Sequence, residues 1–198
     1  MDISVIIPCF NLEAYIGRCL KSILTQDYES DLFEIIVVLD ACEDKSLDIV
    51  TELLKGRKQD KIARVNLRSP GLVRNVGLDM SEGEYVWFID GDDYLTDMQA
   101  FSKLIGAMHE SKRPVGYLKK FDSEKPVPEN WAAWRFFYKR SFIDGIRFPD
   151  LSIDEDIKFF VNVSKRKGFC VTLIGDNLYH HTFPRKGSIV TDYYKDFL

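Results

Sequence analysis

The chain has 198 residues, of which 45% are hydrophobic, and a formal net charge of −4 at pH 7. This length is typical of one domain, and the apolar content is sufficient for a core that folds without disulfides or structural metals. Nucleic-acid binding normally depends on clustered Lys and Arg, so the acidic balance argues against a nucleic-acid partner. We therefore expect residues 1–198 to form a single domain.

The cysteines and the N-terminus bear on the compartment. The four cysteines are few for this length and show no CxxC spacing, so they predict reduced thiols rather than a disulfide framework or a zinc site. The chain has no basic leader and no run of eighteen apolar residues. We expect a cytoplasmic protein without a transmembrane segment, with peripheral membrane contact left open. The cysteines are Cys9, Cys19, Cys42 and Cys170.

The first half of the chain alternates between strand and helix patterns. Four such alternations with apolar strand runs predict an α/β fold in which a mainly parallel sheet is flanked by helices on both faces. Ser69 is expected to cap the third helix, with Pro70 at its first position. The predicted strands are 3–7, 33–39, 62–67 and 84–89, and the predicted helices are 12–23, 47–54 and 70–78.

The second half is less regular. Three prolines among many charges predict a loop or a short edge strand over residues 111–130. Residues 131–138 are rich in aromatic side chains and predict a strand. Residues 153–163 predict a helix whose first turn carries Asp154-Glu155-Asp156, and residues 170–174 and 178–181 predict two further short strands.

Polar residues follow three of the four predicted strands. They are Pro8-Cys9-Phe10-Asn11, Asp40 and Asp90-Gly91-Asp92-Asp93. In a sheet of parallel strands, ligands bind beyond the carboxyl ends of the strands. The sequence therefore predicts one binding site at this edge.

The acidic turn carries the sharpest chemistry. Three carboxylates within four residues repel each other unless a cation compensates them, and Gly91 allows the backbone to turn. Oxygen ligands at this density suit Mg²⁺ or Mn²⁺. An acidic, solvated turn that caps a helix beginning near Thr96 or Asp97 is the alternative, because a DxD triplet is common by chance.

Five motifs occur in an order that resembles family 2 glycosyltransferases of the GT-A fold. The resemblance covers nearly the whole chain, and the ordered set is more specific than any one motif. The segments are Ile7–Asn11, Glu34–Asp40 with Asp44 and Ser46, Arg74–Gly77, Gly83–Asp93, and an acceptor-half block of Trp134, Tyr138–Arg140, Gly145–Pro149 and Asp154–Asp156.

The resemblance implies a single GT-A-like, Rossmann-like domain. Residues 1–93 would form its nucleotide-sugar-binding half, and residues 94–198 its acceptor-binding and catalytic-base half. The implied activity is metal-dependent, inverting transfer of a sugar from a nucleotide-diphosphate sugar, expected to be a UDP-sugar, in polysaccharide or glycoconjugate synthesis. The acceptor would be a hydroxyl of a glycan, a lipid-linked glycan or another molecule.

The resemblance also implies the donor-binding residues. Asp40 would accept a hydrogen bond from the nucleobase, or else cap the helix near Asp44. Pro8, Phe10 and Asn11 would form the wall around base and ribose, although Asn11 could equally be a helix N-cap.

At the diphosphate, Arg74 would reach the phosphates or hold Asp90. Asp90 and Gly91 would face the donor, and Asp92 would bind Mn²⁺ or Mg²⁺. Asp93 would support the turn from outside.

Asp156 is the expected general base, because an acceptor hydroxyl needs a carboxylate within reach to take its proton. The helix N-terminus beneath it would favour the ionised form. Glu155 beside it would contact the acceptor. In the alternative reading, this acidic stretch only complements the helix dipole.

Four further residues have weaker assignments. His181 and Arg185 would contact the diphosphate or complete the metal site, although a lone histidine is more often structural. Trp131 and Trp134 would stack on the acceptor sugar or belong to the core.

Departures from the family pattern are informative. Leu39, Ala41 and Cys42 replace the Asp, Gly and Ser that often surround the nucleobase carboxylate. A Gln-x-x-Arg-Trp signature is absent, so processive polymer synthesis is not expected. Two other functions stay open: a nucleotide-sugar or carbohydrate binding module without turnover, and a nucleotidyltransferase, which would be expected to carry a Gly-rich phosphate loop that Pro8-Cys9-Phe10-Asn11 does not provide.

Overall fold

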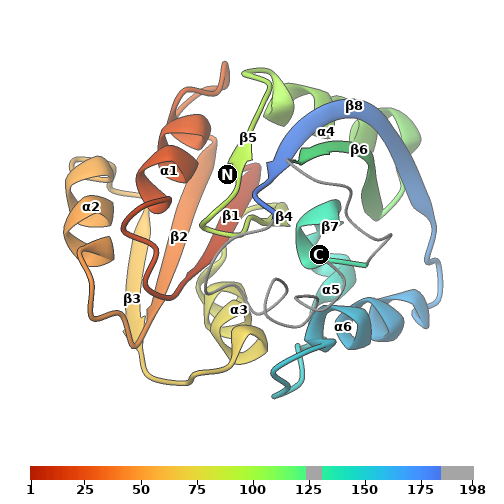
Figure 1. Ribbon diagram of the computed structural model, residues 1–198. Helices are drawn as coiled ribbons and strands as arrows, with labels where there is room; N and C mark the ends of the chain where they lie inside the picture. Colours follow the sequence, from red (N-terminus) through yellow and green to blue (C-terminus); the bar gives the residue numbers. More distant parts are fainter. Residues whose placement is uncertain (124–130, 184–198) are drawn as a thin grey trace.

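A computed structural model describes residues 1–123 and 131–183. One sheet of eight strands, in the order β3-β2-β1-β4-β7-β6-β8-β5, runs through both halves of the chain (Figure 1). The strands are β1 (Ile3–Cys9), β2 (Phe33–Asp40), β3 (Lys61–Val65), β4 (Tyr85–Phe88), β5 (Tyr94–Leu95), β6 (Val115–Ser123), β7 (Phe136–Lys139) and β8 (Val171–His181). The helices are α1 (Ile16–Leu24), α2 (Ser46–Leu53), α3 (Pro70–Met80), α4 (Ala100–Ser111), α5 (Arg140–Ile143) and α6 (Glu155–Ser164), with a 3₁₀ turn at Ala133–Arg135.

The predicted α/β architecture is confirmed in the first half. Strand β1 pairs in parallel with β2 on one side and β4 on the other, and β3 adds to β2 in parallel. All eight residues of β2 are buried, which explains its continuous apolar run. Strand β1 continues through Pro8 to Cys9, beyond the Ile3–Ile6 stretch that pairs with β4. A proline is tolerated there because β1 has a neighbour on only one side.

The second half extends the sheet with mixed directions. Strand β7 is antiparallel to β4 and to β6, β8 is parallel to β6, and β5 is antiparallel to β8. The prediction of a loop or short edge strand over residues 111–130 was wrong for Val115–Ser123, which form a nine-residue strand inside the sheet. The two short strands predicted near the C-terminus are one long strand, β8, whose pairing with β6 shifts register after Leu118 and again after Lys120.

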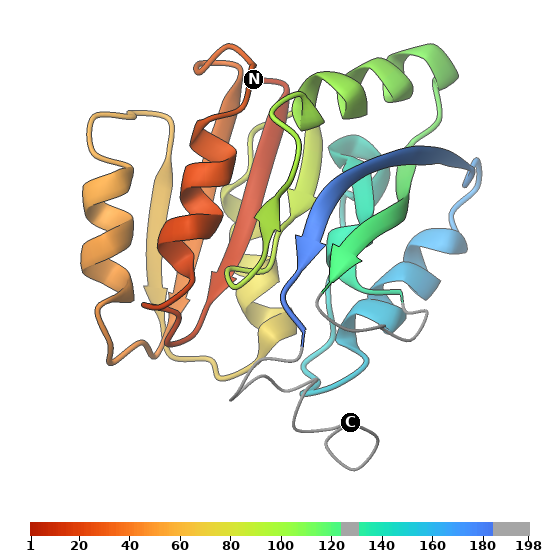
Figure 2. The ribbon, with the colours of Figure 1, turned by 45° about the horizontal axis from the view of Figure 1, so that its top comes forward.

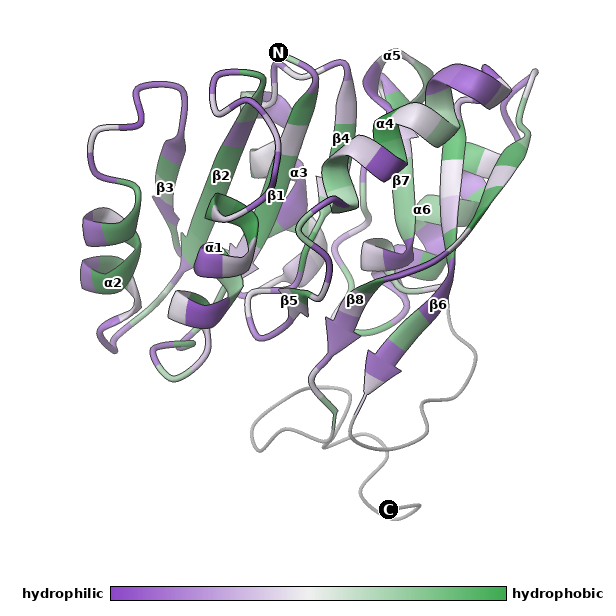
Figure 3. Cartoon of the chain, turned by 90° about the horizontal axis from the view of Figure 1, so that it is seen from above, coloured by the Kyte–Doolittle hydropathy of each residue, from purple (hydrophilic) through white to green (hydrophobic). Residues whose placement is uncertain are grey.

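Helices cover both faces of the sheet (Figure 2). One apolar cluster lies between the sheet and α1, α2 and α4, and a second lies between the sheet and α3, α5 and α6. The central strands are correspondingly hydrophobic in Figure 3. Gly77 of α3 permits close packing on β1, because a Cβ there would lie 2.3 Å from Ile6 Cγ2.

Within residues 1–123 and 131–183, no helix has both the length and the apolar character needed to cross a membrane.

Candidate functional site

The loops after β1 and β2 leave the same edge of the sheet and are hydrogen-bonded to each other. Asn11 Oδ1 accepts from the Glu43 N–H at 2.9 Å, and the Leu12 N–H donates to Ser46 Oγ at 2.9 Å. Helix α1 is preceded by Tyr15 as its N-cap residue, so the N-cap reading of Asn11 was wrong. Asn11 instead has a positive φ of 50° and ties the two loops together. Next to it, Phe10 is 57% exposed.

Asp40 lies at the end of β2 and is buried. Its Oδ1 accepts a hydrogen bond from the Leu67 N–H at 2.7 Å, so it does not cap α2, for which Lys45 is the N-cap residue. The contact ties the end of β2 to the segment that leads into α3. Among the residues that the structure describes, no hydrogen bond to the second carboxylate oxygen of Asp40 is found.

The acidic turn after β4 is anchored by Asp93. This side chain is completely buried and accepts hydrogen bonds from the Tyr179 hydroxyl at 2.6 Å and from the Thr182 N–H at 2.7 Å. His181 Nδ1 lies 3.2 Å from Asp93 Oδ2. The expectation that Asp93 supports the turn from outside was therefore wrong: it holds the turn from inside, against the end of β8.

A residue of α1 and the residue that follows β8 also fix the backbone of Asp92. Its carbonyl accepts from Arg18 Nη2 at 3.0 Å and from Thr182 Oγ1 at 2.8 Å. Gly91 is needed at this turn for space rather than for an unusual backbone angle, since its φ is not positive. A Cβ at Gly91 would lie 2.8 Å from Leu12 Cδ1 and 3.2 Å from the Pro8 carbonyl oxygen.

Arg74 connects the acidic turn to α6. Its side chain is buried, Nη2 donates to Asp90 Oδ1 at 2.9 Å, and Nη1 donates to Glu155 Oε1 at 2.7 Å. Burial alone would lower the pKa of Arg74, but the charges of Asp90 and Glu155 raise it above its usual value. The buried Nε has no hydrogen-bond partner within the described part of the chain. Of the two roles considered for Arg74, the structure favours holding Asp90.

The neighbouring Asn75 orients the segment that precedes α6. Its amide donates to the Phe148 carbonyl and accepts from the Phe148 N–H, both at 2.9 Å. This pair fixes α3 against residues 145–149 and so sets the position of the first turn of α6.

Asp156 lies in that first turn, close to Arg74 and Asp90. Burial raises the pKa of the Asp156 carboxyl, the charge of Arg74 opposes this shift, and Asp90 adds to it. The Ile157 N–H donates to Asp156 Oδ1 at 3.1 Å. Backbone N–H groups at the helix N-terminus do lower the pKa of Asp156, as expected, but burial is the larger effect and the net shift is upward.

Glu155 precedes Asp156 in the same turn. Its side chain is buried against Arg74, and burial raises the pKa of its carboxyl while Arg74 lowers it. This geometry makes Glu155 the support of Arg74 rather than a surface to which an acceptor would bind.

The acidic turn, the buried Arg74 and the neighbouring Asp156, whose carboxyl pKa is raised, therefore form one site. The protein-family model for "Glycosyl transferase family 2" matches residues 4–166. The chain belongs to glycosyltransferase family 2.

Two relatives in this glycosyltransferase family illustrate the match. The poly(ribitol-phosphate) beta-N-acetylglucosaminyltransferase TarS of Staphylococcus aureus is 41% identical over 97 residues, which cover 48% of this chain and 17% of TarS. The glycosyltransferase GlyA of Streptococcus pneumoniae is 39% identical over 166 residues, which cover 82% of this chain and 23% of GlyA. The matched segments thus cover less than a quarter of the length of either relative.

A solved glycosyltransferase structure matches across both halves of the sheet. The crystal structure of S. aureus TarS 1–349 in complex with UDP-GlcNAc superimposes with a TM-score of 0.85 at 26% identity, covering 98% of this chain and 64% of that one. The predicted GT-A-like fold is confirmed by this likeness.

The glycosyltransferase fold separates the two tryptophans proposed as acceptor contacts. Trp134 is 1% exposed and stacks on Tyr179 with ring centroids 4.5 Å apart, so the acceptor role was wrong: the ring belongs to the core. Trp131 is 49% exposed and stacks on Phe160 of α6 at 4.7 Å. It therefore keeps an accessible aromatic surface near the helix that carries Asp156.

The two proposed diphosphate or metal contacts also differ. His181 lies beside Asp93, and although burial alone would lower the pKa of the imidazole, the hydrogen bond and charge of Asp93 raise it. Arg185 lies outside the described residues.

Sequence reasoning missed the residues that hold the acidic turn of this family 2 chain. Arg18, Tyr179 and Thr182 contact Asp92 or Asp93, yet they carry no motif and lie far from the turn in sequence. The one available signal was the third carboxylate of the turn, since a buried Asp93 requires donors from elsewhere in the chain.

Proposed function

We propose that this chain catalyses metal-dependent, inverting transfer of a sugar from a UDP-sugar to an acceptor hydroxyl, in polysaccharide or glycoconjugate synthesis. The observation that carries the proposal is the Arg74 bridge, which brings Asp90 of the acidic turn and the first turn of α6 with Asp156 into one site. Donor binding and proton removal need these two segments to be adjacent.

The donor would lie over the carboxyl ends of β1, β2 and β4. Asp40 Oδ2 would accept the N3–H of uracil, and the exposed ring of Phe10 with Asn11 would form the wall near the base and ribose. Asp90 and Gly91 would lie against the ribose and sugar-diphosphate. The UDP-GlcNAc-bound TarS structure supports a uridine donor, because it shares this fold and 26% of its sequence.

A divalent cation, Mn²⁺ or Mg²⁺, fits the side chains of the turn. Among the described residues, no group of three or more His, Cys, Asp or Glu side chains is arranged to hold a metal ion. A hard cation can nevertheless be held by one or two protein carboxylates, with substrate phosphates and water completing its shell. Asp92 would be its main protein ligand, with His181 as a candidate second. When bound, the cation would neutralise charge on the leaving diphosphate.

Asp156 would take the proton of the acceptor hydroxyl. The acceptor oxygen then forms a bond to the anomeric carbon as the bond from that carbon to the diphosphate oxygen breaks, and this direct displacement inverts the configuration. A raised pKa suits the role, because a base is most effective when its pKa approaches the working pH. Trp131 would stack on the acceptor sugar. The acceptor could be a glycan or a lipid-linked molecule, and a cytoplasmic location with peripheral membrane contact is part of the proposal.

The test measures turnover of a panel of UDP- and GDP-sugars by the purified chain with Mn²⁺, with Mg²⁺ and with EDTA. Release of the nucleoside diphosphate is the readout. We expect metal-dependent release of UDP from one or more UDP-sugars. If a chain shown to be folded releases no nucleoside diphosphate from any donor with either metal, the proposal is contradicted.

A further inference from the structure

The loops after β1 and β2 have a shape that depends on contacts between them. Asn11 and Ala41 both have left-handed backbones, with φ of 50° and 49°. Besides the contacts of Asn11 and Leu12, the Glu13 N–H donates to Asp44 Oδ2 at 2.8 Å, and the Lys45 N–H donates to Glu13 Oε2 at 3.0 Å. A change within this set of contacts would be transmitted to both loops.

The sulfur of Cys42 is at the centre of these contacts. It receives the Asn11 N–H at 3.4 Å and lies 3.2 Å from the Cys9 carbonyl oxygen, to which the protonated thiol donates. The carbonyl that accepts this bond belongs to Cys9, whose own thiol is buried at the end of β1. The Cys42 sulfur therefore lies against Cys9, where the ends of β1 and β2 are adjacent.

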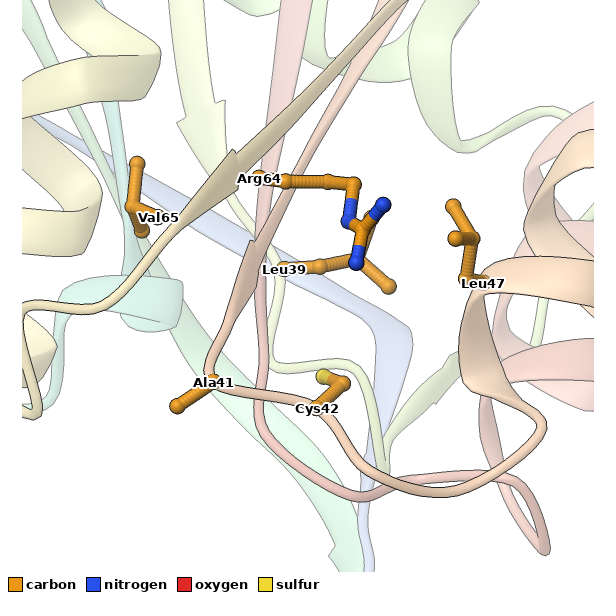
Figure 4. A pocket seen from close by; sticks show the side chains of 6 residues that line it. All are labelled: Leu39, Ala41, Cys42, Leu47, Arg64 and Val65. Carbon is orange, nitrogen blue, oxygen red and sulfur yellow. The ribbon is translucent and has the colours of Figure 1, made fainter.

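A cavity gives solvent access to Cys42. Its volume is about 290 Å³, and Figure 4 shows Leu47 of α2 opposite Leu39 of β2 and Arg64 of β3, with Cys42 on the loop at the end of the cavity. Cys42 is partly exposed, whereas Cys9 is buried. A small solute can thus reach the Cys42 sulfur from the α2 side. Side chains alternate along β2, so Leu39 faces this cavity while Asp40 points to the other face.

The electrostatics distinguish the two thiols. The hydrogen bond from Cys9 and the Asn11 N–H lower the pKa of Cys42 to about 7, against the opposing effects of burial and of Asp44 and Asp40. The hydrogen bond with Cys42 and burial raise the pKa of Cys9. The lowered pKa favours the thiolate, the reactive form, at Cys42 more than at Cys9.

We propose that Cys42 is an oxidation site that forms a reversible disulfide with Cys9 and thereby weakens donor binding. The Cys42 thiolate attacks hydrogen peroxide, the O–O bond breaks, and a sulfenic acid forms as hydroxide leaves. The Cys9 sulfur then attacks the Cys42 sulfur, and the S–OH oxygen leaves as water with the Cys9 proton. In total, two thiols and one peroxide give one disulfide and two waters, and a dithiol reverses the reaction.

The effect on the donor rests on the proposed function. A disulfide draws the Cys42 sulfur toward Cys9 and away from the Asn11 N–H, so the wall formed by Phe10 and Asn11 shifts. Loss of one hydrogen bond between this wall and the donor corresponds to about a tenfold loss of donor affinity. At the position of Cys42 the family pattern often has Ser, so the proposed oxidation would be specific to this chain.

The disulfide can be tested without any substrate. Trypsin cleaves after Arg18, Lys21, Lys45 and Lys167, which places the four cysteines in four different peptides. After stoichiometric peroxide, non-reducing peptide mapping should find the Cys9 peptide joined to the Cys42 peptide, and a dithiol should separate them. Cys42→Ser and Cys9→Ser should each lose the linked peptide, whereas the exposed-cysteine control Cys170→Ser should keep it.

Reaction rates give a second readout. In the untreated chain, iodoacetamide should label Cys42 faster than the more exposed Cys170 at pH 7. Faster labelling of Cys170, or the absence of a Cys9–Cys42 peptide at any peroxide dose, would overturn the proposal.

UDP binding separates this proposal from the proposed function. We expect peroxide to weaken UDP binding about tenfold in the unmodified sequence and in Cys170→Ser, with no change in Cys42→Ser, whose hydroxyl can replace both hydrogen bonds of the thiol. A disulfide that forms while UDP affinity stays constant would overturn the regulatory effect. If UDP does not bind even to the reduced chain, the proposed function and this effect both fail, while peptide mapping still decides the oxidation site.

Discussion

The Arg74 guanidinium lies 2.7 Å from Glu155 Oε1, although 81 residues separate the two in sequence. Both side chains are at most 10% exposed, and the same guanidinium also holds Asp90. A single buried cation thus fixes the acidic turn relative to α6.

Replacing Arg74 by Ala should therefore destabilise the chain by about 3–5 kcal/mol, because it leaves Asp90 and Glu155 without their counter-charge in a buried site. Urea unfolding measures this loss. The matched control is Arg147→Ala, which removes an exposed pair with Asp79 and should cost about 0–1 kcal/mol. Equal costs for the two variants would show that Arg74 is not a structural bridge.

Tyr179→Phe should loosen the acidic turn. The lost hydroxyl donates to Asp93 Oδ2 and accepts from the Asp90 N–H, so a buried carboxylate loses a donor. We expect a cost of about 1–3 kcal/mol in unfolding free energy together with weaker UDP-sugar binding. Tyr117→Phe on β6 is the control. If Tyr179→Phe matches that control in both measurements, the hydroxyl does not hold the turn.

Asp40→Asn should reduce the preference for uridine. The Asn carbonyl can still accept from the Leu67 N–H, but its amide cannot accept the N3–H of uracil. The expected loss is about 1–3 kcal/mol of UDP affinity, or roughly 5- to 150-fold in Kd, in calorimetric titrations of UDP and GDP. If the ratio of the Kd values for UDP and GDP is unaltered, the nucleobase binds elsewhere.

The pH dependence should reveal Asp156. A base works only when ionised, and burial raises the pKa of this carboxyl from 3.8, so the acidic limb of kcat/KM should lie at higher pH than for an exposed Asp. The control is Glu110→Gln, on the surface of α4. Its pH profile of kcat/KM should have the same acidic limb as the unmodified chain. A limb at the ordinary value for aspartate would exclude Asp156 as the base.

The same shift has a consequence for stability. A carboxyl whose pKa is raised on folding stabilises the folded state when protonated, and this contribution is lost as the pH rises through the folded-state value. Asp156→Asn should therefore unfold at higher urea concentration than the unmodified chain at pH 7, with a smaller difference at pH 5. A variant that is less stable at pH 7 would contradict this reasoning.

The strand and helix pattern of residues 1–93 could be predicted because each element there is local and strongly periodic. The boundaries of β1, β2 and α3 differ from the prediction by one or two residues. Ser69 does precede α3, but its side chain makes no capping hydrogen bond and its buried hydroxyl has no partner among the described residues. The boundary is set by Pro70, whose fixed φ suits the first helical position.

The second half could not be predicted in the same way. Strand β6 lies inside the sheet although Lys119 and Lys120 are exposed, because β7 and β8 supply its neighbours from distant parts of the chain. The sequence leaves Trp134 open between an acceptor contact and the core, and only the packing of Tyr179 on its ring shows that it belongs to the core. Long-range contacts of this kind leave no local pattern.

The central claim is that the acidic turn binds the donor while α6 supplies the base. The most direct measurement compares UDP-sugar binding and turnover, with Mn²⁺ and with EDTA, in the unmodified chain, Asp92→Ala and Asp156→Ala. We predict that Asp92→Ala loses metal-dependent donor binding. Asp156→Ala should bind the donor normally and lose turnover by about 10²- to 10⁴-fold. Full turnover in Asp156→Ala, or undiminished metal-dependent binding in Asp92→Ala, would contradict the central claim.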